Sequence, residues 1–175
     1  MAVESMKEAL TGYMGVVSSD HAYIHKGLAY TAIINTGSIS AAYDIAFTTP
    51  DEASGIFVHW RPIGATSSAN YVDIKLYEGD SFSGGSAVTP INRNRESLHT
   101  TNMQAFVSNA TATPTGTILS SLGVGTSGLL GGVAAPADQE LLLKQNTNYV
   151  LTLTPAGATI CNLELFWYEE GNGHS

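Results

Sequence analysis

The segment over residues 140–170 constrains the fold more than any other part of this chain of 175 residues. Three apolar runs are separated by a polar turn at residues 145–148 and a Pro-Ala-Gly turn at residues 155–157. In the last run, apolar Cys161, Leu163 and Leu165 alternate with Asn162 and other residues of different character. A period of two in runs rich in β-branched and aromatic residues predicts strands of a sheet whose two faces differ.

The same alternation recurs elsewhere, most cleanly in residues 71–77, where Val72, Ile74 and Leu76 fall on one face. Turn sequences rich in Gly, Pro and Asp separate the apolar runs. Short strands with one buried face each predict an all-β fold, an antiparallel β-sandwich of the jelly-roll kind. The predicted strands are residues 22–34, 43–48, 56–61, 71–77, 103–108, 117–122, 141–144, 149–154 and 160–168, and the predicted core contains Val72, Ile74, Leu76, Leu151, Leu153, Leu163 and Leu165.

The chain divides into an N-terminal arm over residues 1–20, a single β-sandwich domain over residues 21–170 and a tail over residues 171–175. Residues 5–14 are the one plausible helix, because Ser5 and Glu8 form a capping-box pattern. Two interpretations stay open: a loose terminus, or an arm that docks on a neighbouring subunit. The apolar face of this helix contains Met6, Leu10, Tyr13 and Met14.

Composition limits the possible partners. The net charge of −8 repels phosphate backbones and anionic lipid heads, so we expect no nucleic-acid and no membrane partner. A small basic patch formed by Arg93 and Arg95 is compatible with this charge. The N-terminus lacks the pattern of a secretory signal, and no window is apolar enough to cross a bilayer.

Residues 123–128 spell G-x-G-x-x-G, the loop pattern of dinucleotide sites. Such a loop must open a helix, which could not run comfortably through Gly131, Gly132 and Pro136. The loop is unusually apolar, and we predict that Val124, Leu129 and Leu130 contact another chain.

Residues that could take part in catalysis or bind a metal are scattered along the sequence. His21 and His25 have the spacing of a helical metal pair, but on the predicted strand they would lie roughly 13 Å apart, too far for one ion. Cys161 is expected to be a small buried hydrophobe. We therefore predict a protein that is not an enzyme and has no cofactor and no metal site. Carboxylates that could meet in space are Glu78, Glu140, Glu164, Asp73 and Asp80.

Aromatic residues allow a further alternative. Trp60, Tyr71 and Tyr77 could form a stacking platform for sugar, although cross-strand pairing that stabilises a sheet is the preferred interpretation. His59 alternates with Val58 and Trp60 and is expected at the surface or rim.

Several short segments resemble a known family. They are residues 24–27 leading to Tyr30, residues 76–79, residues 92–97, and Gly131-Gly132 followed by Glu140, Leu143-Lys144, Asn146-Thr147 and Tyr149. In this order they look like a group of tailed-bacteriophage virion proteins that decorate the phage head.

The resemblance implies a capsid-surface protein that is made in the host cytoplasm and stabilises the shell. Its implied partners are the major capsid protein and further copies of itself, as a homo-oligomer such as a trimer. Many weak contacts made at once would hold such a protein in place. Two alternatives stay open: a glycan- or receptor-binding module of a phage tail or head fibre, and a β-sandwich carbohydrate enzyme with two facing carboxylates.

Overall fold

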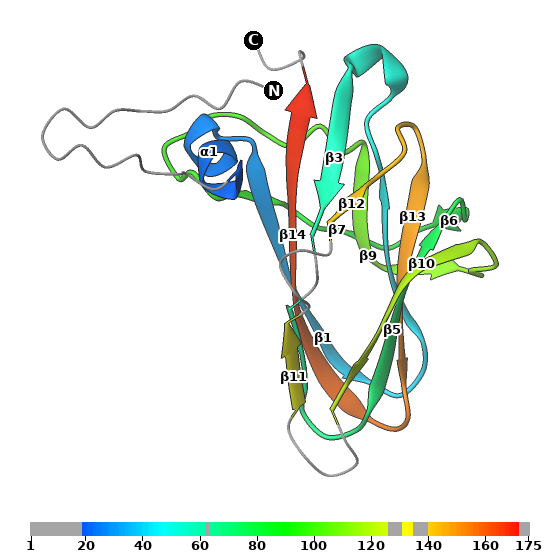
Figure 1. Ribbon diagram of the computed structural model, residues 1–175. Coiled ribbons are helices and arrows are strands. Elements are labelled where there is room, and N and C mark those ends of the chain that lie inside the picture. Colours follow the sequence, from blue (N-terminus) through cyan, green and yellow to red (C-terminus); the bar gives the residue numbers. More distant parts are fainter. Residues whose placement is uncertain (1–18, 62–63, 126–130, 135–139, 172–175) are drawn as a thin grey trace, which may run out of the picture.

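The computed structural model describes residues 19–61, 64–125, 131–134 and 140–171. Two antiparallel sheets pack face to face, which confirms the predicted all-β sandwich (Figure 1). The first sheet has the order β11-β4-β14-β1-β8, with β3 beside β14 and β12 beside β3. Its strands are β1 (Ala29–Ile39), β3 (Ile56–Trp60), β4 (Gly64–Ser67), β8 (Ile91–Asn92), β11 (Gly131–Ala134), β12 (Leu141–Leu142) and β14 (Thr159–Gly171).

The second sheet has the order β10-β5-β13-β2-β9-β6, with β7 beside β9. A 3-10 turn, η1 (Glu52–Ser54), connects β2 to β3, and one helix, α1 (Ser19–Lys26), precedes β1. The strands of the second sheet are β2 (Tyr43–Thr48), β5 (Val72–Glu78), β6 (Phe82–Ser83), β7 (Ser86–Ala87), β9 (Ala105–Ala112), β10 (Thr117–Val124) and β13 (Asn148–Pro155).

The strand pairs are nested, as in a jelly roll. β1 pairs with β14, β2 with β13, β4 with β11, β3 with β12, and β5 with β10. These pairs form one long antiparallel ribbon, which rolls up so that β5 also meets β13 and β14 also meets β3 and β4. The chain therefore crosses several times between the two sheets, and β9 extends the second sheet beyond β2.

The core lies between the sheets and follows the predicted alternation. All seven leucine, isoleucine and valine residues assigned to the core are at most 2% exposed, and Cys161 is buried as expected. Stacked aromatic rings fill the centre, with Phe47 4.7 Å from Trp60 and Trp60 6.1 Å from Trp167 between ring centroids. Trp60 is therefore a core residue and cannot belong to a sugar platform with Tyr71 and Tyr77.

The predicted strand over residues 22–34 is wrong in its first half, because residues 19–26 form α1. The helix ends at Gly27, whose φ of +72° is the left-handed conformation that glycine adopts most easily. The backbone N–H of Gly27 donates to the Ile24 carbonyl, and that of Leu28 donates to the Tyr23 carbonyl. This pair of bonds is the Schellman arrangement, which satisfies carbonyls at a helix C-terminus.

Two buried carboxylates fix the loops between the strands. Asp80 accepts hydrogen bonds from the backbone N–H groups of Thr115 and Gly116. Glu169, with no exposed surface, accepts from the Thr101 hydroxyl, from the backbone and side-chain amides of Asn102 and from the Trp167 indole. Buried carboxylates need such donors, and here the donors hold residues 100–103 against the end of β14.

Candidate functional site

Polar and aromatic side chains gather on the outer face of the first sheet, opposite the core. Along β14 the odd-numbered residues from Cys161 to Glu169 are buried, so the even-numbered residues Phe166, Tyr168 and Glu170 point outward. Tyr168 lies opposite His59 of β3, and α1 covers it because the ring of Tyr23 stacks on it at 4.2 Å.

Tyr168 belongs to the outer-face cluster, a group of five residues that also contains His59, Arg61, Glu140 and Glu170. Glu140 lies at the centre of the cluster. One of its carboxylate oxygens lies 2.7 Å from His59 Nδ1 and accepts a hydrogen bond from the Tyr168 hydroxyl at 2.6 Å. The other oxygen lies 2.9 Å from Arg61 Nη2. The second nitrogen of His59, Nε2, lies 3.1 Å from a Glu170 oxygen. One imidazole therefore bridges two carboxylates.

Electrostatics of the outer-face cluster favour an ionised Glu140. Burial by itself raises the pKa of this carboxyl group, but hydrogen bonds from Tyr168 and His59 and the charge of Arg61 outweigh burial, so the pKa is lowered overall. The pKa of Tyr168 is raised by burial and by its bond to Glu140. Burial is the largest cause, and a hydrogen bond to Glu170 the second, of a rise in the pKa of Tyr23 to about 12.

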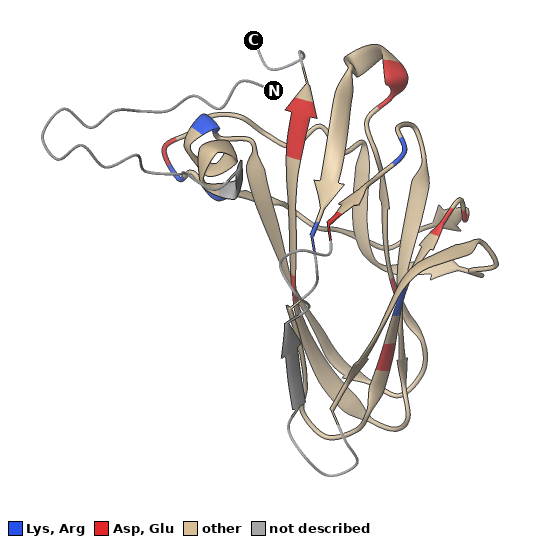
Figure 2. Cartoon of the chain, in the orientation of Figure 1, with Lys and Arg blue, Asp and Glu red and all other residues tan. Residues whose placement is uncertain are grey.

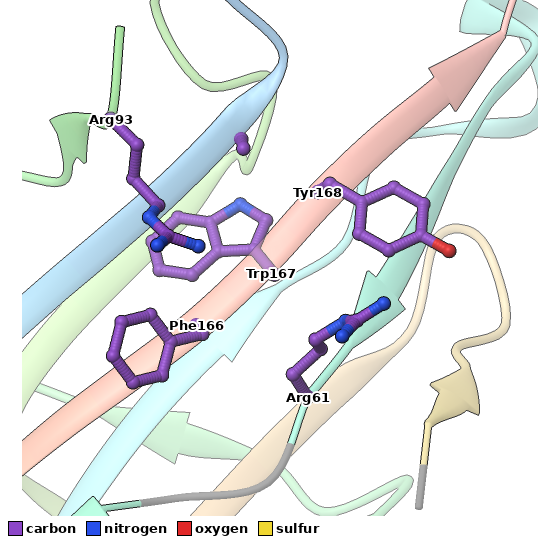
Figure 3. Close-up of a pocket in the computed structure, with 6 residues that line it drawn as sticks. Arg61, Arg93, Phe166, Trp167 and Tyr168 are labelled. Carbon is purple, nitrogen blue, oxygen red and sulfur yellow. The ribbon is translucent and has the colours of Figure 1, made fainter. Parts of the chain in front are cut away.

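A shallow hollow next to this cluster, the arginine pocket, is lined by Ala29, Arg61, Arg93, Phe166, Trp167 and Tyr168 and is partly open to solvent. Figure 3 shows Arg93 and Arg61 approaching from opposite sides of β14. The Arg93 guanidinium carbon lies 5.3 Å from the centre of the Phe166 ring, and that of Arg61 lies 5.4 Å from the centre of the Tyr168 ring. Each cation is thus held over an aromatic face.

The lining of the arginine pocket is positive although the chain has a net charge of −8. Charged residues are sparse on both sheets (Figure 2). Arg61 faces Glu140, whereas Arg93 is exposed and makes no ion pair with any residue that the structure describes. The pocket can therefore attract an anion of small size.

The two histidines of α1 lie together, which corrects the expected separation of about 13 Å. On a helix the i, i+4 spacing brings Nε2 of His21 and Nε2 of His25 to 2.8 Å. Both residues are exposed, and within the described residues no group of three or more His, Cys, Asp or Glu could hold a metal ion.

Of the residues predicted to contact a partner, only Val124 lies in the part of the chain that the structure describes. Val124 is only 1% exposed at the end of β10, so its assignment to a partner interface is wrong: the side chain fills the core. Leu129 and Leu130 lie outside the described residues, as do Met6, Leu10, Tyr13 and Met14. The G-x-G-x-x-G segment connects two strands, since Gly123 belongs to β10 and Gly131 begins β11.

Most of the predicted carboxylate candidates are separated from one another. Glu78 binds Lys144 at 2.6 Å, and Asp73 binds Lys75 at 2.6 Å, and both carboxylates belong to β5 of the second sheet. Asp80 holds a loop and Glu164 is exposed on β14. Of this group only Glu140 enters the outer-face cluster.

Arg61, Tyr168 and Glu170 were not identified by sequence reasoning as site residues. One signal was available: the even-numbered positions of β14 include Phe166 and Tyr168, which are large aromatic residues on a face expected to be solvated. Their partners come from β3 and from the residue before β12, so no local pattern connects them.

Comparison of the chain with models of protein families, with curated proteins and with solved structures gives no match. Among the described residues, no helix has both the length and the apolar character needed to span a membrane.

Proposed function

We propose that this protein is a non-enzymatic virion component that binds the outside of a bacteriophage capsid and stabilises the shell. The proposal is supported by the sequence resemblance described above and by a jelly-roll topology, which is common in viral capsid proteins and in lectins. Because one fold serves many functions, the function must be inferred from the surface residues and not from the fold alone.

The observation that carries the proposal is the distribution of exposed apolar side chains. Eight large hydrophobic residues of the described chain are exposed by 37% or more. Five of them lie on the outer face of the first sheet, as their cross-strand partners place them there. These five are Ile33, Phe57, Ile91, Leu142 and Ile160.

Apolar side chains concentrated on one face favour a protein partner. Phe166 lies across from Thr31, which lies across from Ile91, and Ile33 follows one row further along β1. Arg93 adjoins this row over Phe166. Aromatic residues and arginine among aliphatic neighbours are the composition of interface centres. Weak contacts of this kind, repeated over a homo-oligomer, would hold the protein on a shell.

The test is to add the protein back to phage heads that have been stripped of it. Ile33→Asp places a charge in the apolar row, and we expect its occupancy on the heads to fall by at least about tenfold, because a buried unpaired charge opposes docking. Ile118→Asp is the matched control, since Ile118 is 51% exposed on the second sheet. Far-UV circular dichroism checks that both variants fold.

Equal occupancy of the two variants would remove the outer face from the mechanism. If the unmodified protein binds no shell, capsid attachment itself is wrong. Binding by a second face or by the N-terminal residues would appear as normal occupancy of Ile33→Asp together with added heat resistance of the heads.

Glycan or receptor binding is the second candidate function. The observation that favours it is the arginine pocket, which is concave, has aromatic walls and contains two guanidinium groups. Small-ligand sites combine apolar walls with a few polar groups in this way.

A further inference from the structure

We propose that the arginine pocket binds the carboxylate of an acidic saccharide residue, with a uronic acid as the simplest ligand. The inference deepens the glycan-binding candidate and does not depend on attachment to a capsid. Its basis is the geometry of two arginines over aromatic rings and the charge of the lining.

Arg93 is the principal ligand-binding residue in this proposal. Its guanidinium lies over the Phe166 ring, and its backbone N–H donates to the Ala29 carbonyl at 2.9 Å, which fixes the start of the side chain. The contact with the ring occupies one side of the guanidinium and leaves N–H donors available. A planar fork held in one orientation binds a carboxylate through two parallel hydrogen bonds and loses little side-chain entropy.

Arg61 supplies a second positive charge from the other side of β14. Its side chain is 17% exposed, and its backbone N–H donates to the Phe166 carbonyl at 2.9 Å. The ion pair with Glu140 offsets part of its charge. Arg61 therefore strengthens the attraction for an anion, while Arg93 provides the donors that bind it.

The surroundings of the pocket favour a carboxylate that is carried by a sugar ring. The half-buried Phe166 ring gives an apolar wall for the C–H groups of a sugar ring. Asn35 and Asn162, which bond to each other at 2.6 Å further along the same face, provide amides for hydroxyl groups of neighbouring residues in a chain.

The net charge of the protein argues against dense polyanions. A charge of −8 repels a nucleic acid, which carries one phosphate per nucleotide. A saccharide with one carboxylate per residue meets less repulsion while it still matches the guanidinium fork.

The experiment is an NMR titration of the full chain with D-glucuronate, with D-glucose and acetate as matched probes. We expect glucuronate to shift the amide signals of Arg93, Phe166 and Tyr168, and to bind at least about tenfold more tightly than acetate. Glucose should cause no shift. Arg93→Gln should weaken glucuronate binding by at least about tenfold, and Arg93→Lys should also weaken it, because lysine keeps the charge but lacks the fork.

Arg95→Gln is the control, because Arg95 is an exposed arginine two positions along the chain that does not line the pocket. It should bind glucuronate as the unmodified protein does. Arg93 is itself exposed, so thermal unfolding of Arg93→Gln and Arg93→Lys should match that of the unmodified chain.

Four results would overturn the proposal. Equal affinity for acetate and glucuronate would mean an adventitious ion only. Unchanged binding by Arg93→Gln would place the ligand elsewhere, and equal losses in Arg93→Gln and Arg95→Gln would indicate diffuse charge. Tighter binding of a short glutamate peptide than of glucuronate would assign the pocket to a protein partner. None of these results depends on the add-back to phage heads, so the two proposals fail separately.

Discussion

Glu140 is the residue on which the outer-face cluster depends. It precedes β12, far in sequence from both His59 and Tyr168, and its two oxygens meet three side chains. The carboxylate is about one quarter exposed, so water screens these interactions only in part. Its ionised form is the form that the neighbouring donors and Arg61 stabilise.

This arrangement predicts an acid-dependent contribution to stability. The pKa of Glu140 in the folded protein lies below its ordinary value of 4.5. The stabilisation is therefore fully present above about pH 4.5 and is lost as the pH falls through the lowered pKa of the folded state. We expect the difference in unfolding free energy between the unmodified protein and Glu140→Gln to shrink below about pH 4.5.

Urea denaturation at several pH values between about pH 3 and pH 6 measures this difference. Glu164→Gln is the control, an exposed glutamate on the same face of β14. A difference that stays constant down to about pH 3 would show that the ionised form of Glu140 is not selectively stabilised.

At the scale of secondary-structure elements, α1 is attached to the sandwich by its C-terminal end. Asn94 Nδ2 donates to the His25 carbonyl at 3.1 Å, and Asn92 Nδ2 donates to the Gly27 carbonyl at 2.7 Å. The end of β8 and the loop after it therefore satisfy carbonyls at the helix end, and Tyr23 packs on Tyr168. Together these contacts place α1 over the outer face of the first sheet.

Gly27 is the position where this attachment is most sensitive. Its φ of +72° disfavours other residues, and a Cβ atom there would overlap the Ser97 side chain. We expect Gly27→Ala to lower the unfolding free energy by about 2–4 kcal/mol, from backbone strain together with overpacking.

Gly55→Ala isolates the backbone part of this cost. Gly55 has a φ of +63°, and a Cβ atom added there would meet no other atom within 4 Å, so only the strain of about 1 kcal/mol applies. Urea denaturation of both variants gives the comparison. Equal costs would mean that the Ser97 side chain moves aside freely and adds no overpacking.

At the scale of the whole molecule, the main core joins the two sheets. Leu151 of β13 and Leu163 of β14 lie in different sheets and both belong to this core. Each is at most 1% exposed. We expect Leu151→Ala and Leu163→Ala each to lower the unfolding free energy by about 2–5 kcal/mol, because each leaves a cavity.

Leu142→Ala is the matched control, since Leu142 is 62% exposed on the outer face. Its effect should stay within about 0.5 kcal/mol. Chemical denaturation followed by tryptophan fluorescence measures all three, because Trp60 and Trp167 are buried in the same core. If either core variant matches Leu142→Ala, that leucine does not contribute to the core as its burial indicates.

Local sequence is sufficient to predict most of the strands and their buried faces. Alternation is a local property: Val72, Ile74 and Leu76 must share one face of any strand they form, whatever lies opposite. The same reasoning identified Leu163 and Leu165 as core residues and Cys161 as buried. The error at residues 22–28 came from extending the apolar character of β1 backwards, although Gly27 after Lys26 was a helix-ending signal.

The tertiary structure decides which strands pair. It also decides which outward side chains come together to form a site. Pairs such as His59 and Tyr168 are set by rolling the whole ribbon, which no local pattern records. His59, Arg61, Glu140 and Tyr168 come together because β3 pairs with both β12 and β14. Val124 shows the same dependence: an apolar residue in a glycine-rich segment is a core residue or an exposed one according to what packs on it. Which residues share a face of a strand follows from local alternation and can therefore be predicted from sequence. Which outward residues come together as a surface depends on contacts between distant segments, so only the tertiary structure decides it.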